Sequence, residues 1–348
     1  MPALPNFGFG RCWEAKQAIS VLYFDVCRLR LGVGALPLAG MSDQRPILIA
    51  GPTASGKSGL AIRLAEHYGG VVINADSMQV YRDLRILTAR PSKEDEARAQ
   101  HALFGFVEGS DPYSVGRYRT DAECVFDNLR ADGVRPIFVG GTGLYFKALL
   151  EGLSPIPPTP DDVRAHWRGE ADKLGAKELH RILDSRDPEM AENLVPSDTQ
   201  RIVRALEVLD ATGISLLDWQ RRPGEPLLKE ADTVRLVLSP EREEVHRRIN
   251  ARFEAMMACG ALEEVARLSA SSLDPSLPIM NVLGVRPLMQ HLGGEIAHEE
   301  AFAQAQAETR QYAKRQLTWA RRNMITWKWL SKKEMESSVE KIITFIDS

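Results

Sequence analysis

The stretch Pro46-Ile-Leu-Ile-Ala-Gly-Pro-Thr-Ala-Ser-Gly-Lys-Ser58 decides the fold class of this protein. Its first five residues form a short, mostly apolar run that ends at a glycine, which is typical of a strand buried in a parallel sheet. Residues 51–58 match the Walker A pattern Gly-x4-Gly-Lys-Ser/Thr, and apolar side chains then recur at helical spacing up to Tyr68. A glycine-rich loop between a strand and a helix predicts a phosphate-binding loop in an α/β fold.

This loop is the first candidate site. Its glycines let several backbone N–H groups face one anion, and the start of the helix adds a partial positive charge. Lys57 should contact the terminal phosphates, and the hydroxyl of Ser58 should hold Mg²⁺, the one cofactor that we expect. A glycine turn with an incidental lysine is the weaker interpretation, because the flanking strand and helix lie where the motif requires them. The candidate phosphate-binding residues are Gly51, Pro52, Thr53, Ala54, Ser55, Gly56, Lys57 and Ser58.

Strands and helices continue to alternate after the loop. Buried strands are expected at 71–74 and 136–140, and helices at 58–68, 114–129 and 144–150. This alternation predicts an α/β protein whose P-loop-type parallel sheet is flanked by helices on both faces.

A proline-rich segment, 154–160, ends this alternation, and residues 161–220 then show only helical periodicity. After a second break at 221–226, the apolar run 233–238 reads as a strand that we place back in the first sheet. We therefore expect an all-helical insertion domain in an α/β core that is mostly helical beyond Glu241. The expected insertion helices are 162–174, 177–184, 188–193 and 199–211, and the expected domains are the core (41–155 and 227–335), the insertion (156–226) and a C-terminal tail (336–348).

Residues 1–40 do not fit this plan. An apolar run there is followed at once by Asp25 and Arg28, which is wrong for a signal peptide, and Met41 stands directly before the first strand. We interpret residues 1–40 as a disordered or misannotated extension, with a genuine N-terminal helix as the alternative.

Composition places the protein in the cytoplasm. Its four cysteines are scattered, without a Cys-x-x-Cys pair or a His pair at zinc spacing, so we expect a reducing compartment and no zinc site. No apolar run is long enough to span a bilayer, so we expect no membrane partner. The formal net charge of −3 does not itself indicate a nucleic-acid binder, although a local basic face can exist within such a sum. The cysteines are Cys12, Cys27, Cys124 and Cys259.

Polar side chains follow the second strand, at the sheet edge where ligands of open α/β sheets bind. Asp76 suits a magnesium ligand, a general base or a surface helix cap, and sequence alone leaves these three open. Ser77 and Gln79 carry groups suited to a base edge. The segment Gly140-Gly-Thr-Gly-Leu-Tyr145 lies at another strand-to-helix junction, but it does not match a dinucleotide motif and is weak evidence alone.

Taken together, GPTASGKS, DSMQVY and GGTGLYFKALLEGLSP closely resemble the bacterial tRNA dimethylallyltransferases. The resemblance covers residues 45–330 and includes the segments 198–207, 248–256 and 310–319. It implies that the protein transfers a dimethylallyl group from dimethylallyl diphosphate to N6 of the adenine 3′-adjacent to the anticodon, position 37, of tRNA.

The resemblance also implies roles for individual residues. The loop 51–58, with Thr53, would hold the diphosphate, and Asp76 would take a proton from the adenine amine as N6 attacks the allylic carbon. Thr142 would contact the target nucleotide, and Arg252 would reach the diphosphate, with Arg248 as the alternative.

The partners implied are the anticodon stem-loop of tRNA, where unpaired bases are cheap to unstack, and dimethylallyl diphosphate, with the protein acting as a monomer. Solvated helix charges remain an equal alternative for the arginines of the insertion, because exposed charges mostly contribute little. The implied tRNA-binding residues are Asp76, Ser77, Met78, Gln79, Thr142, Arg164, Gln200, Arg201, Ile202, Val203 and Arg204.

The segment 310–333 supports an RNA partner independently, because it contains eight basic residues and no acidic one. Four aromatic residues lie among them, and packing against the core is the favoured interpretation of the tryptophans over base stacking. They are Tyr312, Trp319, Trp327 and Trp329. The basic residues are Arg310, Lys314, Arg315, Arg321, Arg322, Lys328, Lys332 and Lys333.

Two other functions share the phosphate loop. A small-molecule or nucleotide kinase would also place an aspartate near the second strand, and a P-loop RNA-binding ATPase would bind RNA without transferring a group. The kinase does not explain the helical insertion, the basic C-terminal segment or the pair of motifs at 76–81 and 140–145.

Overall fold

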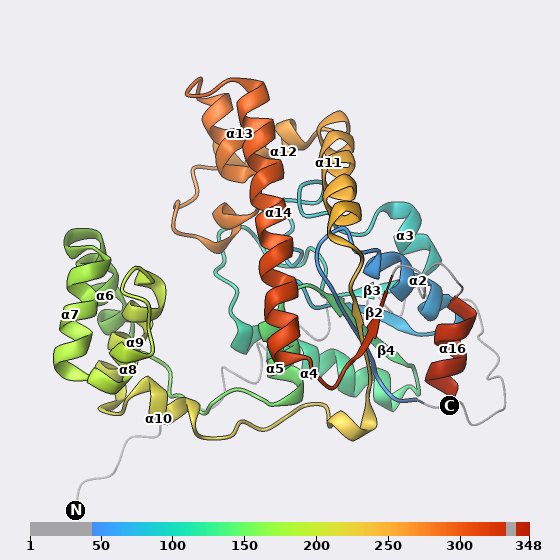
Figure 1. Ribbon diagram of the computed structural model, residues 1–348, viewed down its shortest axis with the longest axis horizontal. Helices are drawn as coiled ribbons and strands as arrows, with labels where there is room; N and C mark the ends of the chain where they lie inside the picture. The colour runs from blue at the N-terminus through green and yellow to red at the C-terminus, as the bar shows by residue number, and fades with distance from the viewer. Residues whose placement is uncertain (1–43, 332–338) are drawn as a thin grey trace, which may run out of the picture. The chain divides into compact units, whose positions relative to one another are not determined.

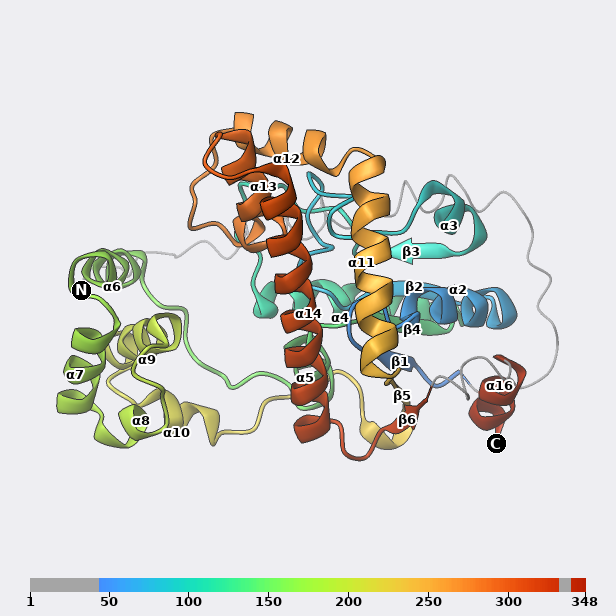
Figure 2. The ribbon, with the colours of Figure 1, turned by 45° about the horizontal axis from the view of Figure 1, so that its top comes forward.

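One parallel sheet lies within the core of the protein (Figure 1). Its six strands follow the order β3-β2-β4-β1-β5-β6, which Figure 2 labels from top to bottom. The computed structural model describes residues 44–331 and 339–348. The central strand β1 pairs with β4 on one side and β5 on the other, so the strand expected at 233–238 does return to the first sheet. The strands are β1 (Ile47–Ala50), β2 (Val71–Asn74), β3 (Gln100–Ala102), β4 (Pro136–Gly140), β5 (Val234–Leu238) and β6 (Lys328–Leu330).

Both faces of the sheet are buried, and alternate residues of each strand serve opposite cores. Leu48 and Ile73 pack with α4 and α5, whereas Ile47 and Val72 pack with α2 and α16. The α/β prediction is confirmed. The helices are α2 (Lys57–Tyr68), α3 (Lys93–Arg98), α4 (Val115–Ala131), α5 (Gly143–Leu150) and α16 (Val339–Asp347).

The C-terminal segment expected to be a tail contains helix α16. Ile342 and Ile346 are buried in the same core as α2, and the hydroxyl of Tyr68 donates a 2.9 Å hydrogen bond to Asp347. Apolar side chains at helical spacing explain why this end of the chain packs on the sheet rather than extending into solvent.

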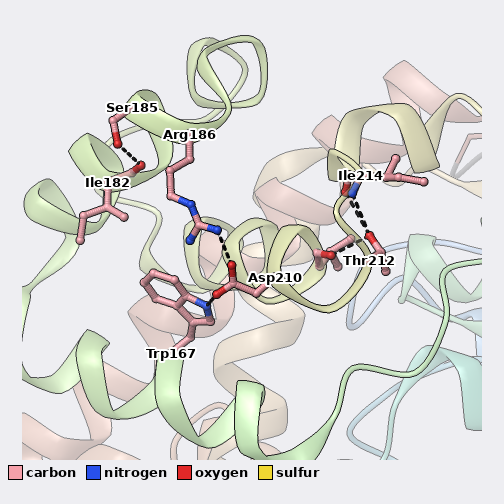
Figure 3. A network of polar contacts seen from close by, with 8 residues as sticks. Trp167, Ile182, Ser185, Arg186, Asp210, Thr212 and Ile214 are labelled. Atoms are coloured by element: carbon pink, nitrogen blue, oxygen red, sulfur yellow. Dashed lines mark hydrogen bonds and ion pairs between the residues drawn. The ribbon is translucent and has the colours of Figure 1, made fainter.

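The four helices expected in the insertion are present, and a fifth short helix follows them. They enclose a hydrophobic core of their own, which includes Trp167, Leu179 and Leu206. Asp210 joins three of these helices, because it accepts a 2.6 Å hydrogen bond from Trp167 Nε1 and pairs with Arg186 (Figure 3). The helices are α6 (Asp161–Leu174), α7 (Ala176–Arg186), α8 (Pro188–Glu192), α9 (Thr199–Thr212) and α10 (Leu216–Gln220).

The long helix α14 (His298–Asn323) packs beside α11 and α13 and continues to α5 near the sheet (Figure 2). It therefore carries side chains from far along the chain to the loops that follow β1 and β4. The remaining elements are α11 (Arg242–Ala258), α12 (Ala261–Ala270), α13 (Val285–Leu292) and the short 3₁₀ helices η1 (Glu230–Asp232) and η2 (Pro278–Asn281).

Two further expectations concern the N-terminal residues with the cysteines and the absence of a membrane-spanning segment. The interpretation of residues 1–40, including Cys12 and Cys27, lies outside the described residues, while Cys124 and Cys259 are free and exposed. Within the described ranges, no helix is both long enough and apolar enough to cross a membrane.

Candidate active site at the carboxyl edge of the sheet

The phosphate loop lies between β1 and α2, as the sequence predicts. Ala54 and Gly56 both have left-handed backbone, with φ of 61° and 92°, which curls the chain tightly between strand and helix. Gly51 has no space for a side chain, because a Cβ there would lie 3.0 Å from the carbonyl oxygen of Leu238. The amine of Lys57 lies over the loop and donates a 3.2 Å hydrogen bond to the carbonyl of Pro52.

Positive charge is concentrated beside this loop without full compensation. Burial lowers the pKa of Lys57 to about 8; the charge of Asp76 opposes this shift, and that of Arg252 adds to it. Burial also lowers the pKa of Arg252, and the neighbouring Arg248 lowers it further. Lys57 is half-buried by surface area and Arg252 is exposed, so both side chains are crowded by protein atoms while water still reaches them. This is the electrostatic setting of a binding site for an anion.

Of the two arginines expected near the diphosphate, Arg248 has an anionic partner. Its Nε lies 2.6 Å from the carboxylate of Glu244, one turn earlier on α11. Arg252 makes no ion pair with any residue that the structure describes, and its charge acts on Lys57. The geometry favours Arg252 over Arg248 at the phosphate loop.

Asp76, Ser77 and Thr142 are brought together from the ends of β2 and β4. The N–H of Ser77 donates to Thr142 Oγ1 at 2.9 Å, and the Thr142 hydroxyl donates to Ser77 Oγ at 3.3 Å. Asp76 accepts a 3.0 Å hydrogen bond from the N–H of Met78 and does not begin a helix, so the helix-cap interpretation is wrong.

Met78 and Gln79 continue this segment. The side chain of Met78 is half-buried and packs against the main core. The side-chain amide of Gln79 donates to the carbonyls of Thr88 and Ala89, at 2.8 and 3.0 Å. The side-chain oxygen of Gln79, Oε1, accepts no hydrogen bond from the residues that the structure describes and can accept one from a ligand.

Close approaches explain the glycines of the second loop. A Cβ on Gly140 would lie 1.9 Å from the carbonyl oxygen of Ala75, and one on Gly143 would lie 2.1 Å from the ring of Trp319. These glycines let the segment around Asp76 and helix α14 approach the loop, so the paired glycines here do more than form a turn.

Gln316 of α14 joins the two loops and was missed by sequence reasoning. It accepts a 2.9 Å hydrogen bond from the N–H of Thr53 and donates a 3.0 Å bond to the carbonyl of Gly141. The only sequence signal was its place in the motif 310–319, because its partners lie far away along the chain.

Two tyrosines border Asp76. Burial raises the pKa of both Tyr145 and Tyr312, and the negative charge of Asp76 raises each further. The ring of Tyr145 stacks on that of Tyr118 with centroids 3.7 Å apart. The surroundings of Asp76 therefore include aromatic side chains.

The expected tRNA-binding residues of the insertion differ in exposure. Gln200 and Arg201 are exposed, and Arg201 pairs loosely with Asp198 at 3.3 Å. Arg204 instead donates to Thr159 at 2.8 Å and pairs with Glu207. Ile202 and Val203 are buried in the core of the insertion, where their side chains hold the helix in place, and Arg164 lies 3.6 Å from Asp161.

The cations of the basic segment differ in their contacts. Arg310 donates to Asn250 at 2.8 Å, and Lys332 and Lys333 lie outside the described residues. The exposed side chains of Lys314, Arg315, Arg321 and Arg322 make no ion pair in the described part of the chain.

Packing accounts for the tryptophans of this segment. Trp327 is buried edge-on to Phe146, Trp329 Nε1 donates to the carbonyl of Met324, and Trp319 covers Gly143. The packing interpretation of these rings is confirmed.

A metal ion would have few protein ligands here. Ser58 lies exposed in the first turn of α2, and no group of three His, Cys, Asp or Glu side chains in the described ranges is arranged to hold a metal. This donor set fits Mg²⁺, which commonly binds through one or two protein oxygens and substrate phosphates and keeps several waters.

Comparison with known proteins is consistent across sequence and structure. A family model described as IPP transferase matches residues 79–323, and one described as isopentenyl transferase matches residues 45–101. The chain is 54% identical to a tRNA dimethylallyltransferase of Methylocella silvestris over 84% of this chain and 96% of that one. It is 52% identical to the enzyme of the same name from Parvibaculum lavamentivorans, over 87% and 96%.

Solved structures with the same architecture have related activities. A tRNA isopentenylpyrophosphate transferase from Bacillus halodurans matches with a TM-score of 0.62 and 30% identity, covering 87% of this chain and 95% of that one. A eukaryotic dimethylallyltransferase acting on tRNA matches with a TM-score of 0.72 and 26% identity, covering 86% and 78%.

Proposed function

The chain belongs to the family of the tRNA dimethylallyltransferases, and we propose that it transfers the dimethylallyl group of dimethylallyl diphosphate to N6 of the adenine at position 37 of tRNA. The observation that carries the proposal is the grouping of Lys57, Arg252 and Asp76 beside the phosphate loop. Both substrates need such a site, because the prenyl donor releases an anionic diphosphate as its carbon–oxygen bond breaks, and the adenine amine must lose a proton as it bonds to that carbon. A kinase has no support from these relatives.

The phosphate loop would act on the leaving group. As the allylic carbon–oxygen bond breaks, negative charge accumulates on the departing diphosphate, where the amides of residues 51–58, Lys57 and Arg252 can stabilise it. Charges that are already in place and partly desolvated do this without reorganising during the reaction. Gln316 would keep the loop in this arrangement, because it holds Thr53 from helix α14.

Asp76 would act as the general base. An adenine amine is a weak nucleophile, so removal of its proton as N6 attacks the carbon assists the reaction, and positioning by Ser77 and Thr142 brings the two reactants together. The Ser77–Thr142 hydrogen bonds fix this side of the site.

Mg²⁺ would be held by Ser58 and the diphosphate, and its positive charge would further stabilise the leaving group. Ser58 lies at the start of α2, in the position that the motif gives to the metal-binding hydroxyl.

The anticodon stem-loop of tRNA is the proposed nucleic-acid partner, and the protein would act as a monomer in the cytoplasm. Extrusion of an unpaired loop base would deliver the adenine to Asp76 at low cost. The exposed cations of α14, Lys314, Arg315, Arg321 and Arg322, suit the phosphate backbone.

Replacement of the base tests this proposal. Asp76→Ala should lower turnover by about 10²- to 10⁴-fold, the usual contribution of a general base, while tRNA binding stays nearly intact. Turnover is measured by mass spectrometry of nucleosides from an unmodified tRNA transcript incubated with Mg²⁺ and dimethylallyl diphosphate. Asp172→Ala, at an exposed position of α6, is the control. Near-normal turnover in Asp76→Ala would exclude the aspartate as the base.

A further inference from the structure

We propose that Asn74 is a positioning residue that fixes the main chain of Asp76, an inference that rests on the proposed function. Asn74 is the last residue of β2 and is fully buried, with 0% of its surface exposed. A buried amide must have its hydrogen-bonding groups satisfied, and here the partners belong mainly to the residue proposed as the base.

The side chain of Asn74 holds Asp76 on both sides of its Cα atom. Its Oδ1 accepts the N–H of Asp76 at 2.8 Å, and its Nδ2 donates to the carbonyl of Asp76 at 2.9 Å. The second hydrogen of Nδ2 goes to the carbonyl of Leu103 at 3.0 Å. Both hydrogens of the amide are therefore used, and the two peptide groups that flank Asp76 are fixed to the end of the strand.

This restraint decides where the Asp76 carboxylate points. One carboxylate oxygen, Oδ1, accepts the N–H of Met78 at 3.0 Å, and Oδ2 meets no donor among the residues that the structure describes. With the main chain held by Asn74 and one oxygen held by Met78, the other oxygen keeps a fixed direction. A misplacement of about 1 Å can cost about 100-fold in rate, so such a restraint matters for proton transfer.

Leu103 shows that the surrounding backbone is adapted to this contact. It is a buried, non-glycine residue with a left-handed φ of 63°, a conformation that persists only where neighbouring contacts enforce it. Its carbonyl is the third partner of Asn74. The chain after it then pairs with the segment after Asp76, because the N–H of Gly105 donates to Gln79 and that of Phe106 to Val80. Asn74 thus connects the segment that carries Asp76 to residues 103–106, which follow β3.

A residue needed only for folding would have the same burial and the same hydrogen bonds, so the test must separate stability from chemistry. Val72→Ala is the matched control, because Val72 lies in the same strand, is 1% exposed and packs in the core on the opposite side of the sheet from Ile73. It should lower the melting temperature through lost packing while leaving the Asp76 contacts in place.

The first experiment compares Asn74→Ala with this control. Turnover at saturating tRNA and dimethylallyl diphosphate, the Kd for dimethylallyl diphosphate and the melting temperature are measured for both variants. Asn74→Ala should lose about 100-fold in kcat with an almost unchanged Kd, whereas Val72→Ala should keep wild-type kcat. Equal kcat values for the two variants at a comparable fall in melting temperature would overturn the proposal.

Asn74→Asp gives a second readout that does not depend on the alanine variant folding. The introduced carboxyl can still accept the N–H of Asp76, but its other oxygen faces two carbonyls and can donate to one of them only when protonated. Burial and the carbonyls favour the neutral acid and so raise its pKa, and turnover relative to wild type should fall as pH rises. A ratio that does not change with pH would overturn the proposal.

These outcomes remain distinct from a failure of the proposed function. Normal turnover in Asp76→Ala would overturn the assignment of Asp76 as the general base. Lost turnover in Asp76→Ala together with wild-type kcat in Asn74→Ala would overturn only the positioning role.

Discussion

The sheet edge and the helical insertion treat charge in opposite ways. In the insertion, arginines lie beside carboxylates of the same domain, as in the pairs Arg186–Asp210, Arg204–Glu207 and Arg221–Glu189. At the sheet edge, burial destabilises the charged ammonium of Lys57 and lowers its pKa, and the positive charge of Arg252 lowers that pKa further. Arg186–Asp210 joins α7 to α9 and Arg221–Glu189 joins the end of α10 to α8, whereas Arg204–Glu207 lies within α9. At the sheet edge, Asp76 offsets this positive charge only in part, which is the electrostatic setting expected of a site that binds an anion.

Among the variants that test this difference between the two regions, removal of the Lys57 amine should have the largest effect. Lys57→Met should weaken binding of dimethylallyl diphosphate by about 100-fold, because a partly desolvated ionic hydrogen bond contributes about 2.8 kcal/mol. Isothermal titration calorimetry measures the loss. Arg63→Met, at an exposed position of α2, is the control and should bind normally.

The same site predicts a pH dependence. Since the pKa of Lys57 is about 8, its amine is protonated and charged at lower pH and loses this proton as pH rises through 8. Wild-type affinity for the diphosphate should therefore fall through this range, and Lys57→Met should lack the fall. A wild-type affinity that stays constant across it would contradict the assignment of this charge to the ligand.

In the insertion, loss of a charge should affect stability rather than chemistry. Asp210→Ala removes the acceptor of Trp167 and the partner of Arg186, and should destabilise the insertion by about 2 kcal/mol. Hydrogen exchange of the amides in α6, α7 and α9 measures this locally. Affinity for dimethylallyl diphosphate should be unchanged, and a large loss of that affinity would count against independent roles for the two regions.

The pKa of Asp210 predicts how its contribution to the stability of the insertion changes with pH. Burial raises it, but the hydrogen bonds from Arg186 and Trp167 outweigh burial and lower it overall. A lowered pKa in the folded state means that the contribution is present above the unfolded pKa and is lost as pH falls through the folded one. Asp210→Asn, which keeps an acceptor for Trp167, should remove this acid sensitivity.

The smallest effect is expected from an exposed cation of the insertion. Arg201→Ala should weaken tRNA binding by about threefold and reduce the salt slope by about 1, as one phosphate contact would. Its side chain is 75% exposed, and Arg181, 78% exposed and paired with Glu178, provides the matched control. Equal salt slopes for Arg201→Ala and Arg181→Ala would contradict a contact between Arg201 and an RNA phosphate.

Local patterns made the strand, loop and helix at the start of the fold predictable. The order strand, phosphate loop and helix at 46–68 is local, and each step has its own residue pattern. The strands β3 and β6 were missed because each has three residues at an edge of the sheet, where polar side chains are tolerated. Helix α10 was missed because it has five residues.

The site was predictable only in part, for a related reason. The loop 51–58 and Asp76 follow strands of the same sheet, so their proximity follows from topology. Gln316 and Asn74 act through hydrogen bonds to backbone groups of other segments, and no local pattern encodes those partners. Asn74 in particular reads only as the end of a strand.

The most direct test of the sheet edge as a prenyl diphosphate site is a pair of calorimetric titrations of the intact protein with Mg²⁺, one with dimethylallyl diphosphate and one with ATP. Tight binding of the prenyl donor that is lost in Lys57→Met, with far weaker binding of ATP, is the predicted result. Tight binding of ATP with none of dimethylallyl diphosphate would contradict it.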